Sequence, residues 1–326
     1  MLKDSFGRIH DYLRISLTDK CNLRCVYCHP TNALHGHHDY AKNMSAAEIE
    51  KIVSVFVGEG VNKIRLTGGE PLIRKDAKEI IERLSNYPVK LTITTNGVFV
   101  HDFIDTFRQA KLKSVNVSLD SLNKEKNFIL NKRDEFDSVK RNIDLLLEND
   151  FHVKVNVVVM NGVNSDEVNN FIEWTKDFPL HIRFIEFMPF PGNKWDHEKV
   201  FTHQQILKTV SEKYPVEKLS DDAHDTAKKY FVPNHKGTFA VISTMSEPFC
   251  SGCNRMRITT DGKMRNCLFS KTETDLLTAL RAGNDIVALI RECLYGKHYM
   301  LGGNHDEHWG EEETASHRRS MLGIGG

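Results

Sequence analysis

Two groups of three cysteines in the sequence have spacings that suit metal or cluster chemistry. In the first group, Cys21, Cys25 and Cys28 lie within the stretch CNLRCVYC. A structural zinc ion or a fully ligated iron–sulfur cluster takes four protein ligands, so three cysteines leave one position open. The seventh cysteine, Cys293, stands alone in LIRECLYG, and we expect it to be a buried thiol without a ligand role.

The second group consists of a C-x2-C pair, Cys250 and Cys253, and of Cys267 further along the chain. Arg255 and Arg257 follow the pair two residues apart, so both side chains would leave one face of a strand. The expected site is three thiolates beside two guanidinium groups. Thiolates bind iron–sulfur clusters and zinc alike, so the type of ligand does not decide between a cluster and a zinc ion for this group.

A hairpin is expected between the C-x2-C pair and the last cysteine of the second group. The Asp-Gly dipeptide at 261–262 is the strongest signal for a two-residue turn between strands. Such a turn predicts that Thr260 lies opposite Lys263 and that Met256 lies opposite Cys267. The hairpin would then carry the third cysteine back beside the other two.

Strand-like runs alternate with amphipathic helical segments from residue 12 to about 190. Apolar residues recur with helical spacing over 46–56, and Ser45 and Glu48 have the spacing of a capping box. Six strands alternating with helices favour parallel βαβ units, whose ligand sites lie at the carboxyl ends of the strands. The strands are expected at residues 12–17, 63–67, 90–95, 114–119, 153–160 and 181–187.

The motifs whose residues could bind a ligand or take part in a reaction each follow one of these strands. CNLRCVYC follows the first strand, TGGEP the second, TNG the third, SLDS the fourth and EFMP the sixth. Five motif-bearing loops at one rim predict a single active site. Beyond residue 200, Thr202 and Gln205 predict a capped helix, and a strand pair is expected on either side of NHKG at 234–237.

The composition argues against several classes of protein. Lys plus Arg and Asp plus Glu both total 44 among 326 residues, so the formal net charge is zero. This balance, without a basic, aromatic-rich patch, disfavours nucleic-acid binding. No apolar run approaches the ~18 residues of a membrane span, and the charged N-terminal stretch does not resemble a signal peptide. We therefore expect a cytoplasmic protein that binds neither nucleic acid nor membrane.

The first cysteine group resembles the signature of the radical S-adenosylmethionine (SAM) superfamily. That signature is C-x3-C-x2-C after the first strand, with an aromatic residue before the last cysteine, here Tyr27. LTGGEP after the next strand matches a second superfamily motif, which binds the methionine amino group of SAM. The resemblance implies that Cys21, Cys25 and Cys28 hold a [4Fe-4S] cluster whose open iron binds SAM.

Further motifs resemble one family within that superfamily, the GTP 3′,8-cyclases of molybdenum-cofactor biosynthesis. They are SFGRIHDYLRISLTDKCNLRCVYC, GVNKIRLTGGEPLIRKD, TTNG, VNVSLDSL, RFIEFMP, FCSGCNRMRITTDGKMRNCLF and the terminal Gly-Gly. The match runs in order from about residue 4 to 326. The resemblance implies a lyase-type, radical SAM cyclisation of GTP to 3′,8-cyclo-7,8-dihydro-GTP, with SAM and two [4Fe-4S] clusters as cofactors.

The fold implied by the resemblance is α/β. An incomplete (βα)6 TIM-type radical SAM barrel would span residues 1–225, and a C-terminal domain with the second cluster would span residues 226–326 and close the barrel. The product would pass to a downstream cyclic pyranopterin monophosphate synthase. The family is commonly dimeric, so a homodimer is one expectation, although the sequence shows no interface and does not identify the electron donor.

The resemblance also implies roles for individual residues. The second cluster would be held by Cys250, Cys253 and Cys267, and its open iron would meet the guanine. SAM would contact Tyr27, Gly69, Ser118 and Met188. GTP would contact Arg14, Lys63, Arg65, Thr94 (or Thr95), Lys154, Arg183, Arg255, Met256 and Arg257. The expected catalytic residues are Arg14, Arg255, Arg257, Gly325 and Gly326, and the two glycines would reach back toward the active site.

Two other interpretations stay open. A radical SAM enzyme that modifies peptides would be expected to carry more than three C-terminal cysteines, and a non-enzymatic zinc protein that binds nucleic acid conflicts with the zero net charge. One position departs from the family pattern, because His29 precedes Pro30 where the family usually has Met. Imidazole can bind iron, but three thiolates and SAM already fill the first site, so we expect His29 not to be a ligand.

Overall fold

The structure is a computed structural model that describes residues 1–28, 43–304 and 319–324. Six parallel strands form the centre of a curved sheet, each paired with the next in chain order. They lie within one residue of the expected bounds at each end. The strands are β1 (Tyr12–Ser16), β2 (Lys63–Thr67), β3 (Lys90–Thr95), β4 (Ser114–Ser118), β5 (His152–Val159) and β6 (His181–Glu186).

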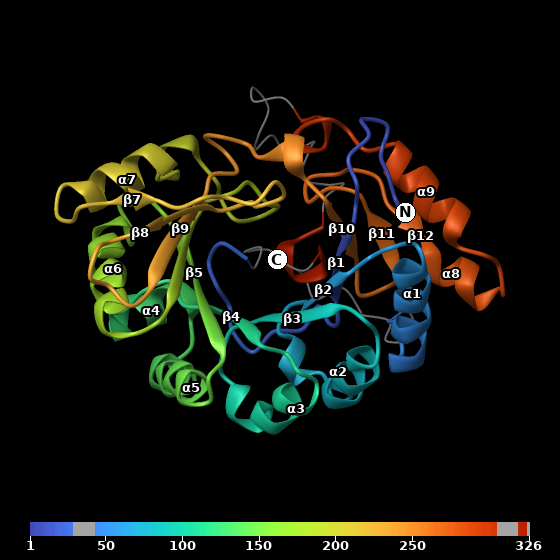
Figure 1. The fold of residues 1–326 in the computed structure, drawn as a ribbon, viewed down its shortest axis with the longest axis horizontal. Helices are drawn as coiled ribbons and strands as arrows, with labels where there is room; N and C mark the ends of the chain where they lie inside the picture. The colour runs from blue at the N-terminus through green and yellow to red at the C-terminus, as the bar shows by residue number, and fades with distance from the viewer. Residues whose placement is uncertain (29–42, 305–318, 325–326) are drawn as a thin grey trace.

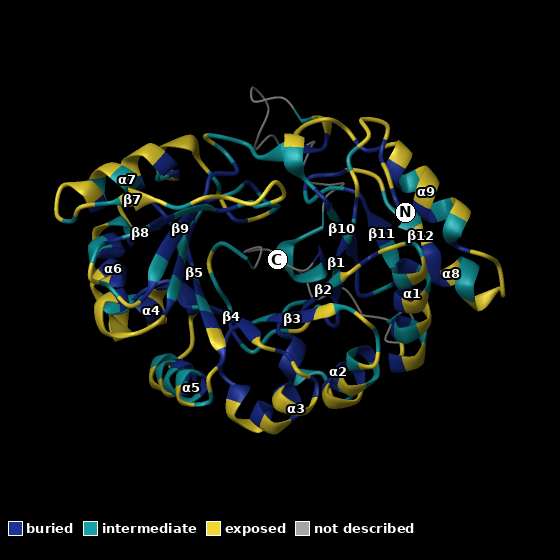
Figure 2. Cartoon of the chain, viewed as in Figure 1, coloured by how far each residue is buried: buried dark blue, intermediate teal, exposed yellow. Residues whose placement is uncertain are grey.

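Helices cover the convex side of this sheet. Figure 1 shows them around the outside of the curved row of strands, and Figure 2 shows that their buried sides face the strands. The expected incomplete (βα)6 barrel is therefore confirmed. The helices of this part are α1 (Ala46–Gly58), α2 (Ala77–Ser85), α3 (Ile104–Gln109), α4 (Lys124–Asn131), α5 (Phe136–Glu148), α6 (Val168–Asp177) and α7 (His203–Ser211).

Both capping boxes predicted from the sequence are present. The backbone N–H of Glu48 donates to the Ser45 hydroxyl over 3.3 Å, and the Glu48 carboxylate accepts from the Ser45 backbone over 2.8 Å. Thr202 and Gln205 make the same pair of bonds at the start of α7. Each box satisfies donors that a helix N-terminus would otherwise leave unpaired.

The C-terminal part extends the same sheet at both ends. Strand β9 (Thr238–Ile242) pairs in parallel with β6, and β10 (Arg255–Ile258) pairs in parallel with β1. Strand β8 (Lys228–Phe231) pairs antiparallel with β9 around NHKG, as expected. The remaining elements are β7 (Glu217–Lys218), β11 (Lys263–Arg265), β12 (Thr274–Asp275), α8 (Leu276–Arg281), α9 (Val287–Tyr295) and α11 (Met321–Ile324). A domain boundary at 225/226 stays a prediction.

The hairpin of β10 and β11 corrects the predicted register by one residue. Thr259, rather than Thr260, lies opposite Lys263, since its N–H donates to the Lys263 carbonyl over 2.9 Å. Gly262 adopts φ +71°, which a three-residue loop with a left-handed residue requires. The ladder then pairs Arg257 with Arg265 and Ile258 with Met264, so Met256 does not lie opposite Cys267.

The strands have apolar outer faces and polar inner faces. Ile64, Leu66 and Val155 are fully buried and belong to the apolar core that includes the helices. Arg65 and Asn116, which occupy the alternate positions, point into the barrel. A barrel interior is usually filled by branched apolar residues, so this polar interior indicates a polar ligand. In the described part of the chain, no helix is long and apolar enough to cross a membrane.

Candidate active site

Both cysteine groups line one cavity at the carboxyl ends of the barrel strands. The first group approaches it from the loop after β1, and the second group approaches from the segments that flank β10 and β11. Helix α11 lies inside the ring of strands (Figure 1), and its residues Met321 and Leu322 also line the cavity. The tertiary structure thus brings together two sites that are more than 200 residues apart in the sequence.

Backbone hydrogen bonds hold the first cysteine loop against α4. The N–H groups of Arg24 and Val26 donate to the carbonyls of Asn131 and Leu130, both over 2.9 Å. Within the loop, the Cys28 N–H donates to the Cys25 carbonyl over 3.0 Å. These backbone hydrogen bonds therefore fix the loop on α4.

The two glycines of TGGEP allow the loop after β2 to pack on the cysteine loop. A Cβ at Gly68 would lie 2.5 Å from the Thr18 carbonyl oxygen, and one at Gly69 would lie 2.2 Å from that of Lys20. The Gly69 N–H donates to the Thr18 carbonyl over 2.6 Å. The lack of a side chain at these two positions therefore lets them pack against the backbone of the cysteine loop. Both glycines also line the cavity.

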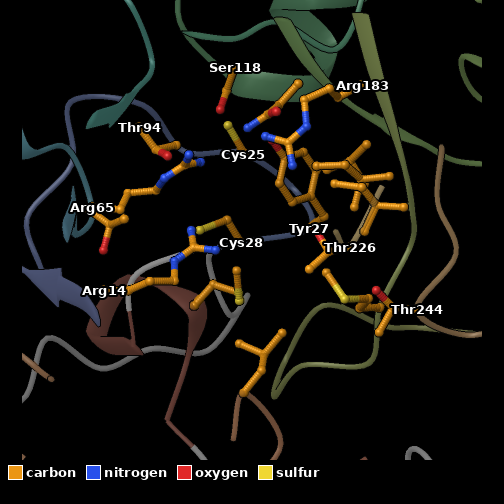
Figure 3. A pocket seen from close by; sticks show the side chains of 18 of the residues that line it. Arg14, Cys25, Tyr27, Cys28, Arg65, Thr94, Ser118, Arg183, Thr226 and Thr244 are labelled. Atoms are coloured by element: carbon orange, nitrogen blue, oxygen red, sulfur yellow. The ribbon is translucent and has the colours of Figure 1, made fainter. Parts of the chain in front are cut away.

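Glu70, the acidic residue of the same motif, is fully buried and joins its own loop to the end of β3. Its carboxylate accepts from the Asn96 N–H over 2.6 Å, from the Thr95 hydroxyl over 2.7 Å and from the Leu72 N–H over 3.0 Å. Burial raises the pKa of Glu70 to about 7, although these donors oppose the shift. The Thr95 hydroxyl is thereby engaged, whereas the buried Thr94 hydroxyl has no hydrogen-bond partner among the described residues and lies at the cavity (Figure 3).

Tyr27 and Asp120 form a buried pair beside the first cysteine group. The Tyr27 hydroxyl donates to Asp120 over 2.7 Å, and the other Asp120 oxygen accepts from the Val158 N–H over 2.9 Å. Burial raises the pKa of Cys28 to about 12, and the charges of Cys21 and Asp120 add to this shift. Three half-buried thiols next to a carboxylate would resist ionisation without a bound cation or cluster.

The second cysteine group has cationic neighbours instead. The Cys253 sulfur accepts from the Arg255 guanidinium over 3.7 Å and from the Lys297 ammonium over 3.6 Å. Burial alone would raise the pKa of Cys253, but the charges of Arg255 and Lys297 outweigh it and lower the pKa to about 6. Cys250 accepts from the Leu301 N–H over 3.5 Å.

Three arginines form a row across neighbouring strands. Arg257 of β10 lies opposite Arg14 of β1, which lies opposite Arg65 of β2. Figure 3 shows Arg14 and Arg65 at the cavity with Arg183 on the other side, and all four arginines line it. Burial lowers the pKa of Arg183 to about 9, and the charge of Arg65 adds to the shift. Like charges in register repel one another, and an anionic ligand would offset that repulsion.

Asn116 lies between two of these guanidinium groups. With its amide oriented to satisfy the surrounding donors, its oxygen accepts from both Arg65 and Arg183. Asn156, on the neighbouring strand, has a buried side-chain oxygen without a partner among the described residues, and it lines the cavity. Unpaired buried polar atoms at Asn156 and Thr94 are what a polar ligand would satisfy.

The other predicted site residues fall into two sets. Tyr27, Ser118, Met188 and Arg255 line the cavity. Lys63 and Lys154 do not line it, because they lie nearer the amino ends of their strands. Burial lowers the pKa of Lys154 to about 7, and the charges of Arg183, Arg65 and Lys63 add to the shift. These lysines thus continue the cationic interior beneath the arginines.

One predicted contact is corrected and three lie outside the described residues. Met256 is fully buried in the apolar core, because strand alternation turns its side chain away from the face that Arg255 and Arg257 share. Its side chain therefore does not reach the cavity. Gly325, Gly326 and His29 lie outside the described residues.

Sequence reasoning missed several residues at the site. Thr226 and Thr244 line the cavity from the C-terminal part (Figure 3), and Lys297 contacts Cys253 from beyond α9. Arg319 anchors the segment that leads into α11, since its guanidinium pairs with Asp261 and Glu273 over 2.7 Å each. None of these residues belongs to a periodic pattern or a motif that could have revealed it.

Both cysteine groups offer the same donor set, three thiols that line the cavity. Thiolates are ligands that iron–sulfur clusters take. Within residues 1–28, 43–304 and 319–324, no three His, Cys, Asp or Glu side chains are placed to hold a single metal ion.

Comparisons with known families and structures give consistent results. The Radical SAM superfamily matches residues 15–175, and the family described as Molybdenum Cofactor Synthesis C matches residues 180–300. Among solved structures, that of SuiB from Streptococcus suis has a TM-score of 0.65 at 15% identity, and it covers 89% of this chain and 68% of that chain. At this identity the likeness shows the fold alone.

Curated relatives are similar over the whole chain. The mitochondrial GTP 3′,8-cyclase of Arabidopsis thaliana is 41% identical over 100% of this chain and 84% of that protein. The GTP 3′,8-cyclase of Desulforamulus reducens is 37% identical over 99% of each. Molybdenum cofactor biosynthesis protein 1 of Mus musculus is 45% identical over 89% of this chain. The chain spans about half the length of that protein, 46%.

Proposed function

The chain belongs to the GTP 3′,8-cyclase family of the radical SAM superfamily, and from this premise we propose that it cyclises GTP to 3′,8-cyclo-7,8-dihydro-GTP in molybdenum-cofactor biosynthesis. Relatives named for this activity match essentially the full chain. The observation that carries the proposal is the pair of Arg65 and Arg183, which share the Asn116 oxygen in the cavity that both cysteine groups line. Two guanidinium groups side by side suit the phosphates of a nucleotide.

Two clusters and SAM account for the cysteines. Cys21, Cys25 and Cys28 would hold the first [4Fe-4S] cluster, and SAM would complete its coordination. Cys250, Cys253 and Cys267 would hold the second cluster. When bound, the first cluster and SAM supply the radical that starts the reaction, and the second cluster supplies an open iron and an electron.

The residues around the first cluster would hold SAM. Tyr27, Gly69, Ser118 and Met188 line the cavity on that side. The Tyr27–Asp120 hydrogen bond fixes the tyrosine ring, and Glu70 fixes the loops that carry Gly69 and Asn96. These residues position SAM and exclude water from the reacting atoms.

The cationic residues would hold the triphosphate. Among the described residues, neither Arg65 nor Arg183 forms an ion pair with a carboxylate, and Asn116 keeps their guanidinium groups apart in a fixed orientation. Thr94 would donate its otherwise unpaired hydroxyl. Lys63 and Lys154 would add longer-range attraction from the amino ends of their strands.

The C-terminal segment would complete the cavity. Met321 and Leu322 of α11 line it, and the ion pairs of Arg319 with Asp261 and Glu273 hold the segment on the β10–β11 hairpin. These contacts support the proposal that Gly325 and Gly326 reach the reacting groups beside Arg14, Arg255 and Arg257. A homodimer and transfer of product to a downstream cyclic pyranopterin monophosphate synthase stay predictions of the resemblance, and a cytoplasmic location stays a prediction from the sequence.

Anaerobic turnover tests the proposal directly. The reconstituted protein is incubated with SAM, dithionite and GTP that carries deuterium at C3′. We expect GTP-dependent 5′-deoxyadenosine that contains deuterium, together with the cyclised product, and neither with ATP in place of GTP. If 5′-deoxyadenosine does not depend on GTP, or carries no deuterium, the assignment is wrong. Stoichiometric zinc in place of iron would favour the non-enzymatic interpretation.

A further inference from the structure

Lys297 is a buried lysine whose ammonium touches the second cysteine group. It follows α9 and is 4% exposed. Its ammonium donates to the Cys253 sulfur over 3.6 Å, to the Arg255 carbonyl over 3.2 Å and to the Asn266 carbonyl over 2.5 Å. These three acceptors account for its three N–H donors.

The charge of this ammonium needs an anionic partner. Lys297 forms no ion pair with a carboxylate in the described part of the chain, and its two carbonyl acceptors are neutral. Burial of a charge is costly unless an opposite charge compensates it. The Cys253 thiolate is the anionic group within hydrogen-bond distance of the Lys297 ammonium.

Lys297 also ties the ligand-bearing segments together. Arg255 is two residues beyond Cys253, and Asn266 directly precedes Cys267. The two carbonyl contacts therefore hold the start of β10 and the end of the hairpin at one point. Asn266 is fixed further because its side-chain amide donates to the Cys293 carbonyl over 2.7 Å.

The described residues place no cationic donor on a sulfur of the first cysteine group. The Cys21 sulfur accepts from two neutral donors, the Leu23 N–H over 3.4 Å and the Asn96 amide over 3.8 Å, and the nearby Arg24 guanidinium donates to the Cys21 carbonyl over 2.6 Å. Cys253, by contrast, has two cationic donors, Lys297 and Arg255. Among the described residues, cationic hydrogen-bond donors to sulfur are therefore found at the second group.

We propose that Lys297 is a positioning residue for the second cluster and raises its reduction potential. The inference rests on the proposed function, which supplies that cluster. Reduction adds one electron to the cluster, and a cation bonded to a ligand sulfur stabilises the more negative, reduced form. The same contacts hold the Cys253 and Cys267 segments at the spacing the cluster needs.

A redox titration of the Lys297→Met variant tests this role. The background is full-length protein with Cys21, Cys25 and Cys28 replaced by serine, so that only the second cluster is read by electron paramagnetic resonance. Dithionite supplies the electron. We expect a fall in midpoint potential equivalent to at least a tenfold change in the reduction equilibrium, 59 mV for one electron. Lys271→Met, an exposed lysine near Cys267, is the matched control and should leave the potential unchanged.

Iron content decides the remaining outcomes. An unchanged potential in a Lys297→Met variant that keeps about four iron per chain overturns the proposal. If that variant loses its iron, Lys297→Arg is compared. If Lys297→Arg keeps its iron, the positive charge at this position is what the cluster needs. If both variants lose their iron, the proposal is overturned and Lys297 has a packing role. If the background with Lys297 intact holds no cluster, the proposed second cluster itself is wrong, whatever Lys297 does.

Discussion

The first cysteine group lies beside two buried carboxyl groups, Glu70 and Asp120, whereas the second lies beside Arg255 and Lys297. Both groups offer three thiols to one cavity. The pKa of Cys28 in the first group is raised to about 12, whereas that of Cys253 in the second is lowered to about 6 and that of its neighbour Cys250 is raised. Burial raises the pKa at both sites, and only at Cys253 do neighbouring cations overcome it.

This difference indicates what each open position accepts. Carboxyl groups near the first group favour a ligand that brings positive charge, as the amino group and sulfonium of SAM do. Cations near the second group favour an electron-rich ligand, as a guanine base is. The same charges predict that the second cluster has the higher reduction potential, since positive surroundings stabilise the reduced form.

Cysteine substitution has the largest expected effect and tests whether the two groups are independent. Cys25→Ser and Cys253→Ser should each lower the iron content from about eight to about four per chain and abolish GTP-dependent product. Cys293→Ser is the control, because that thiol packs near the Met264 carbonyl rather than at the cavity. Loss of all iron in either single variant would show that the groups form one site.

Glu70→Gln tests whether the buried carboxyl group beside the first cysteine group has a raised pKa. Because the folded pKa is raised to about 7, the folded state keeps a proton that the unfolded state releases at lower pH. The free energy of unfolding should therefore fall by about 3 kcal/mol as pH rises from about 4.5 to about 7. Urea unfolding of the cluster-free protein measures this loss. In the Glu70→Gln variant, the free energy of unfolding should lack this dependence on pH. If it changes equally with pH in both proteins, the raised pKa is not that of Glu70.

Arg319→Ala tests the connection between the second group and the C-terminal segment. Loss of both ion pairs should release α11 from the hairpin and lower kcat/KM for GTP about tenfold, which is about 1.4 kcal/mol. Arg281→Ala is the matched control, because Arg281 also contacts a carboxylate, Glu48, but lies away from the cavity. Equal losses in the two variants would point to a general effect on stability.

Two threonine substitutions separate the roles of neighbouring residues, and Thr94→Val has the smallest expected effect on stability. Thr95→Val removes a donor to Glu70 and should cost about 1–3 kcal/mol of unfolding free energy. Thr94→Val should change stability by less than about 0.5 kcal/mol, since its hydroxyl has no partner in the described part of the structure. It should instead raise the KM for GTP several-fold. The reverse pattern in denaturation and kinetic assays would assign the substrate contact to Thr95.

The local features of this protein could be read from the sequence because each depends on neighbouring residues. Strand-like runs predicted the six barrel strands, helical spacing predicted α1, and capping boxes predicted the starts of α1 and α7. The cysteine spacings predicted which thiols converge. The single-residue error in the β10–β11 register arose because Asp-Gly permits both a two-residue and a three-residue loop, and backbone geometry at Gly262 selected the longer one.

The sequence by itself determined the alternating fold, the family and two groups of three thiols. The sequence also placed Arg255 beside the second group, whereas the tertiary structure decided the other charged neighbours of the thiols. Lys297 contacts Cys253 from 44 residues further along the chain, and Arg319 contacts Asp261 from 58 residues further along. Such contacts join single polar residues from separate elements, and no periodicity or spacing records them. Only the folded chain shows that Cys253 has a second cationic neighbour and that Glu70 and Asp120 lie beside the first group.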